Sequence, residues 1–258
     1  MIQIDPKTVF SLKDRVAIVT GGAIGLGKTI AEFYAAYGAN IVIADIDGDG
    51  AKATAEDISQ TGVKAIGVQC DVGIKADVDR TIETTLEEMG GLQILVNNAG
   101  INVREPALEV SEEHWDKIIN VNLKGVFLFS QAAGKVMAKQ NYGKIVNMAS
   151  IQAVIAMPLR TAYCASKGGV TQMTKQMAVE WASLGIRVNA IAPSFFITPM
   201  NTELFDDKEM STFITERTPL GRPGEADELG GSAVFLASPA SDFITGHVLL
   251  VDGGWTAI

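Results

Sequence analysis

The sequence predicts a single-domain α/β protein built on a doubly wound, seven-stranded parallel sheet. Short apolar runs rich in β-branched residues recur along the chain, and longer segments with helical apolar spacing separate them. Strands that are apolar on both faces are typical of a parallel sheet covered by helices on both sides, and right-handed crossovers then give the doubly wound arrangement. The expected strands are residues 16–20, 41–44, 65–68, 94–96, 144–148, 187–191 and 248–251.

The expected helices lie between these strands and include residues 28–37, 77–89, 112–139 and 163–183. No linker, repeat or charge block interrupts the alternation, so we expect one domain over residues 1–258. Residues 194–217 break the rhythm, because they follow a strand but are long and rich in Phe, Met and acidic residues. Such a segment is typical of a substrate lid, although an ordinary surface excursion fits the same pattern.

Composition excludes several classes of function. The chain has 258 residues, is 47% hydrophobic and carries a net charge of −9, so it can bury a large core but lacks the basic surface that binds nucleic acid or an anionic membrane. Two cysteines and two histidines leave no disulfide framework and few metal ligands. With no apparent signal segment or membrane span, we expect a cytoplasmic protein without a metal.

A glycine-rich loop joins the first strand to the first helix. The strand at residues 16–20 runs into Gly21-Gly-Ala-Ile-Gly25-Leu-Gly27, and a helix follows from Lys28. Glycine permits positive φ and lets a pyrophosphate approach the backbone, while the helix N-terminus offers free N–H groups to the phosphate. The order of strand, loop and helix predicts a Rossmann-type dinucleotide site, with Gly-x-x-x-Gly-x-Gly as a variant of the more familiar spacing.

Acidic residues follow the second and third strands. Asp45 could accept hydrogen bonds from the adenosine ribose and would repel a 2′-phosphate. The nearby positions that might offset this repulsion carry no basic group: Gly22, Ala23, Ile24 and Ile46. The pattern favours NAD over NADP, unless Asp45 is only a turn or capping residue. Asp71 could contact adenine or cap the next helix.

Tyr163 and Lys167 are four residues apart, so a helix would place them on one face. A lysine cation favours the phenolate, and a positively charged nicotinamide would add to this effect, so we expect a tyrosine pKa below its ordinary value. Taken alone, the pair also fits a solvated helix face. Ser150 lies just past the strand at residues 144–148, at the edge where doubly wound sheets hold their sites.

Further motifs lie along the chain: Thr20-Gly-x-x-x-Gly-x-Gly27, Asn97-Asn-Ala-Gly100, Asn122, Ser150, Tyr163-x-x-x-Lys167 and the Pro193 turn. With this set the chain resembles the short-chain dehydrogenase/reductase family over about residues 12–255. Within the family it looks most similar to the bacterial gluconate 5-dehydrogenase and 2-deoxygluconate 3-dehydrogenase members, through Arg104-Glu-Pro-Ala, Ser150-Ile-Gln-Ala and the ending Ser241-Asp-Phe-Ile-Thr-Gly-His247…Asp252-Gly-Gly-Trp255.

The resemblance implies roles for these residues. Tyr163 would be the general acid/base, and Ser150 would hydrogen-bond the substrate oxygen. Lys167 would hold the nicotinamide ribose, and Asn122 would anchor a water that links Lys167 to solvent. The residues expected to contact NAD are Gly21, Ile24, Gly25, Leu26, Gly27, Asp45, Asp71, Val72, Asn98, Ala99, Gly100, Tyr163, Lys167, Pro193, Phe196 and Thr198.

One departure from the family falls beside the expected nicotinamide position. The chain has Pro193-Ser194 where the family commonly has Pro-Gly, so Ser194 brings a Cβ and a hydroxyl to this place. Thr198 keeps the position that usually contacts the carboxamide. We expect cofactor binding to survive; the sequence leaves the local geometry at Ser194 open.

The candidate substrate residues are Arg104, Gln152 and Arg160. Either arginine could pair with a substrate carboxylate, although each could equally be a surface side chain. An apolar lid that excludes water is expected from Phe195, Phe196, Met200 and Phe205, unless these side chains simply pack against the sheet.

These observations predict an NAD-dependent oxidoreductase that acts on a secondary alcohol or ketone of a sugar acid or polyol. Two alternatives are a 3-oxoacyl-carrier-protein reductase, which usually goes with NADPH and a basic docking patch, and a non-catalytic nucleotide-sensing protein. The resemblance also implies a homotetramer, paired through the helices at residues 112–139 and 163–183, with the C-terminal segment near another interface.

Overall fold

A seven-stranded sheet forms the centre of the computed structural model, which describes residues 5–198 and 205–258. The strand order is β3-β2-β1-β4-β5-β6-β9, and every neighbouring pair is parallel. The predicted sheet is therefore confirmed. Its strands are β1 (Val16–Thr20), β2 (Asn40–Asp45), β3 (Ala65–Gln69), β4 (Ile94–Asn97), β5 (Gly143–Met148), β6 (Ile186–Pro193) and β9 (Val248–Val251).

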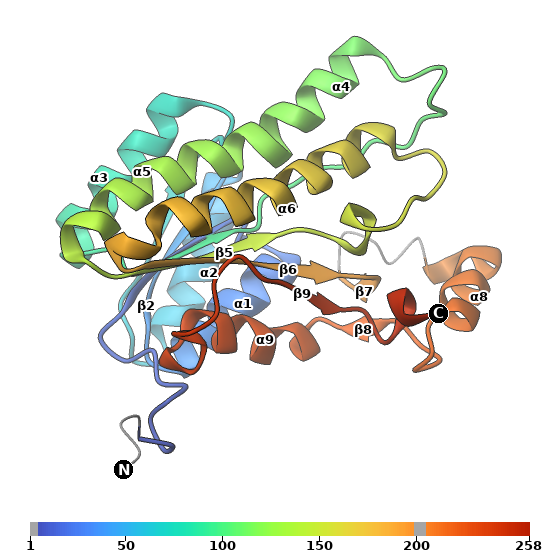
Figure 1. The fold of residues 1–258 in the computed structure, drawn as a ribbon. Helices are drawn as coiled ribbons and strands as arrows, with labels where there is room; N and C mark the ends of the chain where they lie inside the picture. Colours follow the sequence, from blue (N-terminus) through green and yellow to red (C-terminus); the bar gives the residue numbers. More distant parts are fainter. Residues whose placement is uncertain (1–4, 199–204) are drawn as a thin grey trace.

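Helices cover both faces of this sheet (Figure 1). One face packs against α1 (Gly25–Ala36), α2 (Gly48–Ser59) and α9 (Asp227–Ala237), and the other packs against α3 (Lys75–Met89), α5 (Gly125–Gln140) and α6 (Thr161–Trp181). Neighbouring residues of β1 point to opposite faces of the sheet. Val19 packs in the hydrophobic core under α1, α2 and α9, and Ile18 packs in the core under α3, α5 and α6. Among residues 5–198 and 205–258, none of the helices combines the length and the hydropathy of a membrane-spanning segment.

The order of the strands reverses between β1 and β4. From β1 the chain winds outward through β2 and β3, and from β4 it winds the other way through β5, β6 and β9. The helix that follows β1, α1, and the helix that leads from β4 to β5, α5, therefore lie on opposite faces of the sheet. Their separation opens a crevice at the carboxyl ends of β1 and β4. The fold therefore places its ligand cleft beside Thr20 and Asn97, where these strands end.

The expected helix at residues 112–139 is not regular. It begins as α4 (Glu112–Ile119), passes through a π-helical turn at Asn120–Lys124 and continues as α5. The prediction of one uninterrupted α-helix is corrected here, because a π-turn adds a residue to the hydrogen-bonded ring and shifts the side chains that follow. Asn122 lies in this turn and is fully buried.

The segment after β6 contains β7 (Phe196–Ile197), which pairs with β8 (Gly224–Glu225), and α8 (Lys208–Arg217). Phe195 and Phe196 are only 8% and 5% exposed. Phe195 packs on Trp255 with ring centroids 5.1 Å apart, and Phe205 joins the same cluster. Most of the surface of Phe195 and Phe196 is therefore buried by packing against the body of the protein. This is the alternative to a lid whose apolar side chains face the substrate. Met200 lies outside the described residues.

Candidate active site

Two connected cavities occupy the carboxyl edge of the sheet. The first has a volume of about 500 Å³ and lies over the ends of β1, β2 and β4. The second has a volume of about 410 Å³ and lies over β5, β6 and the start of α6. Both volumes are in the range typical of small-molecule sites. The cavities form one cleft because they share the wall residues Leu26, Asn98, Gly100, Ile101, Ser194 and Thr198.

The glycine loop is held in a shape that only glycine fits. Gly21 and Gly25 have φ of 62° and 61°, in the left-handed region. A Cβ on Gly27 would lie 2.1 Å from the carbonyl oxygen of Gly21, so any side chain there would displace the loop. The Asn98 amide donates to that same oxygen at 2.8 Å and ties the loop to β4.

The start of α1 fits a phosphate group. Ile24 occupies the capping position but provides no side-chain acceptor for the first helical N–H groups. These N–H groups and the positive end of the helix dipole therefore remain available to an anion. The loop and the helix start are consistent with the pyrophosphate of a dinucleotide.

Acidic residues line the far end of the first cavity. Asp45 accepts hydrogen bonds from the backbone N–H groups of Ala23, at 3.0 Å, and Asp47, at 3.1 Å. Asp47, and not Asp45, caps α2. Asp71 accepts from the backbone of Gly73 at 2.8 Å, while its carboxylate still borders the cavity. Among the described residues, every charged side chain that lines this cavity is acidic, which makes it unfavourable for a 2′-phosphate.

Ser150, Tyr163 and Lys167 meet in the second cavity. Ser150 follows β5 and hydrogen-bonds with Tyr163, which lies in the first turn of α6. Lys167 Nζ lies 5.6 Å from the centre of the Tyr163 ring, so the predicted pairing on one helix face is confirmed. The same ammonium donates to the carbonyl oxygen of Met148 at 2.6 Å and is only 4% exposed.

The prediction that Lys167 lowers the pKa of Tyr163 is wrong for the protein without its cofactor. Burial raises the pKa of Tyr163, and the hydrogen bond with Ser150 and the charge of Arg160 only partly oppose this rise. Burial also lowers the pKa of Lys167 to about 8. The Lys167 ammonium is therefore poorly solvated, and its hydrogen bond goes to the Met148 carbonyl oxygen. Arg160, and not Lys167, is the cation that lowers the pKa of the Tyr163 phenol.

Asn122 lines neither cavity and instead fixes part of the wall. Its side-chain oxygen accepts from the backbone N–H of Ile101 at 2.8 Å, and its amide donates to the carbonyl oxygen of the same residue at 2.8 Å. A Cβ on Gly100 would lie 3.4 Å from Asn122 Oδ1 and 3.7 Å from Lys167 Nζ, so these three residues are neighbours. Contact between the Asn122 side chain and a substrate is not supported by this position.

Arg104, Gln152 and Arg160 all line the second cavity. Arg160 is 9% exposed, and burial together with the charge of Arg104 lowers its pKa. It occupies the N-terminal capping position of α6 but makes no capping hydrogen bond. A cation is unfavourable at this end of a helix unless an anion balances it. Within residues 5–198 and 205–258, neither arginine forms an ion pair, so the arrangement fits an anionic substrate group.

The structure brings nearly all of the expected cofactor residues into this cleft. Tyr163, Lys167 and Pro193 line the second cavity, and Gly27 lies in the wall of the glycine loop. The expected residues that line the first cavity are Gly21, Ile24, Gly25, Leu26, Asp45, Asp71, Val72, Asn98, Ala99, Gly100, Phe196 and Thr198.

Sequence reasoning missed several wall residues, among them Cys70, Ile101 and Val121. The position of Cys70, one residue past β3, is a signal that could have found it. Ser194 also lines both cavities, but its φ is outside the left-handed region and its N–H donates to Val251 at 3.2 Å. Replacing the usual glycine therefore causes no backbone strain here.

The fold and this cleft define a nicotinamide-dependent oxidoreductase that acts on CH–OH groups. The family model described as enoyl-(acyl carrier protein) reductase matches residues 21–256. The chain belongs to the short-chain dehydrogenase/reductase family.

Characterised relatives include enzymes of sugar acids. The chain is 41% identical to 5-keto-D-gluconate 5-reductase of Escherichia coli, with 95% of this chain and 97% of the relative covered. It is 43% identical to 2-dehydro-3-deoxy-D-gluconate 5-dehydrogenase of Bacillus subtilis, with 95% and 96% covered. A gluconate 5-dehydrogenase from Burkholderia cenocepacia, crystallised with NADP and tartrate, is 41% identical, covers 97% of this chain and 98% of its own, and superposes with a TM-score of 0.94.

Proposed function

We propose that the protein is an NAD-dependent dehydrogenase that interconverts a secondary alcohol and a ketone in a sugar acid. The observation that carries this proposal is the presence of two unpaired arginines, Arg104 and Arg160, in the cavity that also contains Tyr163 and Ser150. A substrate with a carboxylate at one end would pair with the guanidinium groups. Its hydroxyl or carbonyl oxygen would then reach the phenol. The sugar-acid substrates of the relatives support the same class of substrate.

The acidic first cavity supports NAD as the cofactor. The Asp45 carboxylate is fixed by two backbone N–H groups and borders the cavity, where it would accept hydrogen bonds from ribose hydroxyls. A 2′-phosphate in its place would meet Asp45, Asp47 and Asp71 without a facing cation among the described residues. The relative from Burkholderia cenocepacia was crystallised with NADP, and the assay described below therefore compares the two cofactors.

Each residue of the second cavity would have a separate task. A nicotinamide bound in this cleft would supply the hydride chemistry. Tyr163 would take the proton from the substrate hydroxyl during oxidation and return it during reduction. Ser150 would donate a hydrogen bond to the reacting oxygen. Lys167 would hold the nicotinamide ribose. Asn122, which lies outside the cavity, would keep the neighbouring wall in place and would anchor a water beside Lys167.

We further propose that residues 194–217 act as a substrate lid. Thr198 and Ser194 border both cavities, so this segment starts at the substrate position. Farther along, Phe205 and Ile214 join the cluster around Trp255, which would anchor the lid to the body of the protein.

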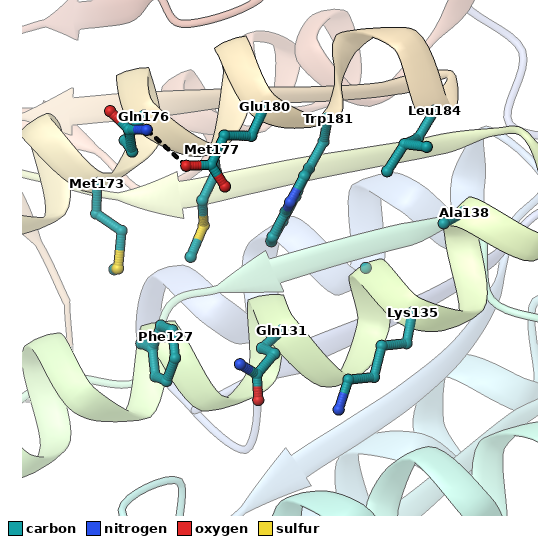
Figure 2. Close-up of a pocket in the computed structure, with 11 residues that line it drawn as sticks. Phe127, Gln131, Lys135, Ala138, Met173, Gln176, Met177, Glu180, Trp181 and Leu184 are labelled. Atoms are coloured by element: carbon teal, nitrogen blue, oxygen red, sulfur yellow. Dashed lines mark hydrogen bonds between the residues drawn. The ribbon is translucent and has the colours of Figure 1, made fainter.

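The groove between α5 and α6 supports the proposed homotetramer. It has a volume of about 500 Å³, and Figure 2 shows Phe127 of α5 facing the groove together with Met173, Met177 and Trp181 of α6. Phe127 remains 41% exposed, and an apolar strip of this kind on paired helices fits a second copy related by two-fold symmetry. The free thiols Cys70 and Cys164 support a cytoplasmic location.

Turnover assays test the proposed function. The protein would be incubated with NAD or NADP and with D-gluconate or its neutral counterpart sorbitol, and reduced nicotinamide would be followed by absorbance. We expect turnover of the acid with NAD. Arg160→Ala should raise the KM for the acid by about tenfold or more, because a charged hydrogen bond contributes about 1.5–3 kcal/mol. The control Arg80→Ala, on the exposed side of α3, should leave KM unchanged.

Other outcomes would contradict the proposal in distinct ways. Binding of NAD without turnover of any sugar acid or polyol would favour a nucleotide-sensing protein. Turnover of 3-oxoacyl substrates with a strong preference for NADPH would favour the carrier-protein reductase and would also refute the argument from Asp45.

A further inference from the structure

Glu105 lies beside both arginines of the second cavity. It follows Arg104 in the chain, and its backbone pairs with Arg160 in an isolated parallel bridge. The Glu105 N–H donates to the carbonyl oxygen of Leu159 at 3.2 Å. Paired residues of neighbouring strands lie only about 4.8 Å apart, so Glu105 is within side-chain reach of an arginine.

The carboxylate of Glu105 is bonded to a histidine and not to either arginine. Its Oε1 lies 2.6 Å from Nδ1 of His114, in the first turn of α4. The backbone of His114 is itself held by the Ser111 hydroxyl, which accepts its N–H at 3.1 Å. Throughout the described chain, no ion pair joins Glu105 to Arg104 or Arg160.

The backbone that presents Arg160 is also constrained. Leu159 has φ of 63°, in the left-handed region that is rare for a residue with a γ-branched side chain. Such strain is typical of positions where the surrounding structure fixes a functional group. The turn and the bridge to Glu105 fix the backbone of Arg160, so a change in its charge environment can come from a movement of the Glu105 side chain without movement of the backbone.

We propose that His114 is a positioning residue for substrate recognition: it holds the Glu105 carboxylate and so keeps Arg104 and Arg160 available to the carboxylate of the substrate. This inference rests on the proposed function. Without His114, the freed Glu105 side chain would pair with an arginine and act as an internal competitor for the anion. The effect would appear as weaker anion binding, with the chemistry at Tyr163 unchanged.

Tartrate and D-gluconate are the probes for this proposal. Tartrate would be titrated calorimetrically into the NAD-saturated protein, and KM and kcat would be measured with gluconate. We expect His114→Ala to weaken tartrate binding and raise the gluconate KM by about tenfold, with kcat nearly unchanged. His114→Gln, which keeps a hydrogen-bond donor, should lie closer to the wild type. The control His247→Ala removes an exposed histidine elsewhere and should have no effect.

The double variant Glu105→Gln/His114→Ala separates this proposal from a general loss of structure. Removal of the competing charge should restore tartrate affinity and KM to near the wild-type values. A double variant as weak as His114→Ala would overturn the proposal, as would a His114→Ala protein with wild-type affinity. Tartrate binding with no turnover of gluconate would refute the proposed function alone, whereas absence of tartrate binding to the wild type would overturn the positioning role.

Discussion

Replacement of Lys167 by methionine should stabilise the protein in the absence of cofactor. Lys167 is 4% exposed, and burial lowers its pKa from an ordinary value near 10.5 to about 8. The fall of about 2.5 pKa units corresponds to about 3.4 kcal/mol by which burial disfavours the charged form near neutral pH. The hydrogen bond to the Met148 oxygen offsets about 1.5–3 kcal/mol of this. Lys167→Met should therefore raise the free energy of unfolding by about 1 kcal/mol.

The predicted gain depends on pH in a defined direction. Because the folded-state pKa of Lys167 is lowered, the folded protein is destabilised relative to the unfolded chain at pH below about 8. This penalty decreases as the pH rises through the folded pKa of about 8 and vanishes near the unfolded value. The advantage of Lys167→Met should thus be greatest near pH 7 and should turn into a net loss by pH 10, where the penalty has largely disappeared but the hydrogen bond to Met148 is still lost.

Urea unfolding at several pH values, together with the melting temperature, measures this prediction. The expected gain of about 1 kcal/mol corresponds to about 2–4 °C in a chain of this size. Lys144 gives a matched control, because it is also buried but pairs with Asp242 at 2.8 Å and with Ser241 at 3.1 Å. Lys144→Met should lower the free energy of unfolding by about 1–2 kcal/mol, since it removes these partners.

Two outcomes would refute the reasoning about Lys167. One is a loss of stability in Lys167→Met as large as that in Lys144→Met. The other is a gain that does not depend on pH. Turnover provides a separate measurement. Lys167→Met should lose activity even though it is more stable, as expected for a residue whose role is functional and not structural.

Three further predictions concern the cleft. Tyr163→Phe should lower kcat by about 10²–10⁴, with little change in the NAD affinity measured by fluorescence titration. For the wild type, kcat/KM for oxidation should rise with pH, because oxidation needs the base form of the phenol and burial raises the pKa of Tyr163. Asp45→Asn, which keeps a hydrogen-bond acceptor, should raise the NADP to NAD ratio of kcat/KM about tenfold or more; an unchanged ratio would contradict the electrostatic argument. Gly27→Ala should weaken NAD binding severely, since the Cβ would lie 2.1 Å from the Gly21 oxygen, whereas Gly231→Ala, which meets no atom within 4 Å, should add about 1 kcal/mol of stability.

Local sequence patterns were sufficient for the sheet and for the reactive pair. The apolar runs predicted all seven strands because a strand buried on both faces requires continuous apolar residues, and this requirement is met within the run itself. The proximity of Tyr163 and Lys167 was also predictable, since helical geometry alone places residues four apart on one face.

Local patterns failed where packing against distant segments decides the result. The π-turn at Asn120–Lys124 has no clear signal in the sequence, because it depends on the fit of Asn122 against Ile101. The aromatic side chains after β6 likewise gave no sign that Trp255, near the C-terminus, would cover Phe195.

The sequence by itself determined the succession of the seven sheet strands along the chain, the glycine loop and the chemical identity of the reactive groups. Only the tertiary structure decided the electrostatics of the site: the raised pKa of Tyr163, the lowered pKa of Lys167 and the burial of Arg160 without an acidic partner. The physical reason is that secondary structure follows from spacing along the chain, whereas the free energy of a charge depends on how much water the folded protein removes from it and on which groups replace that water.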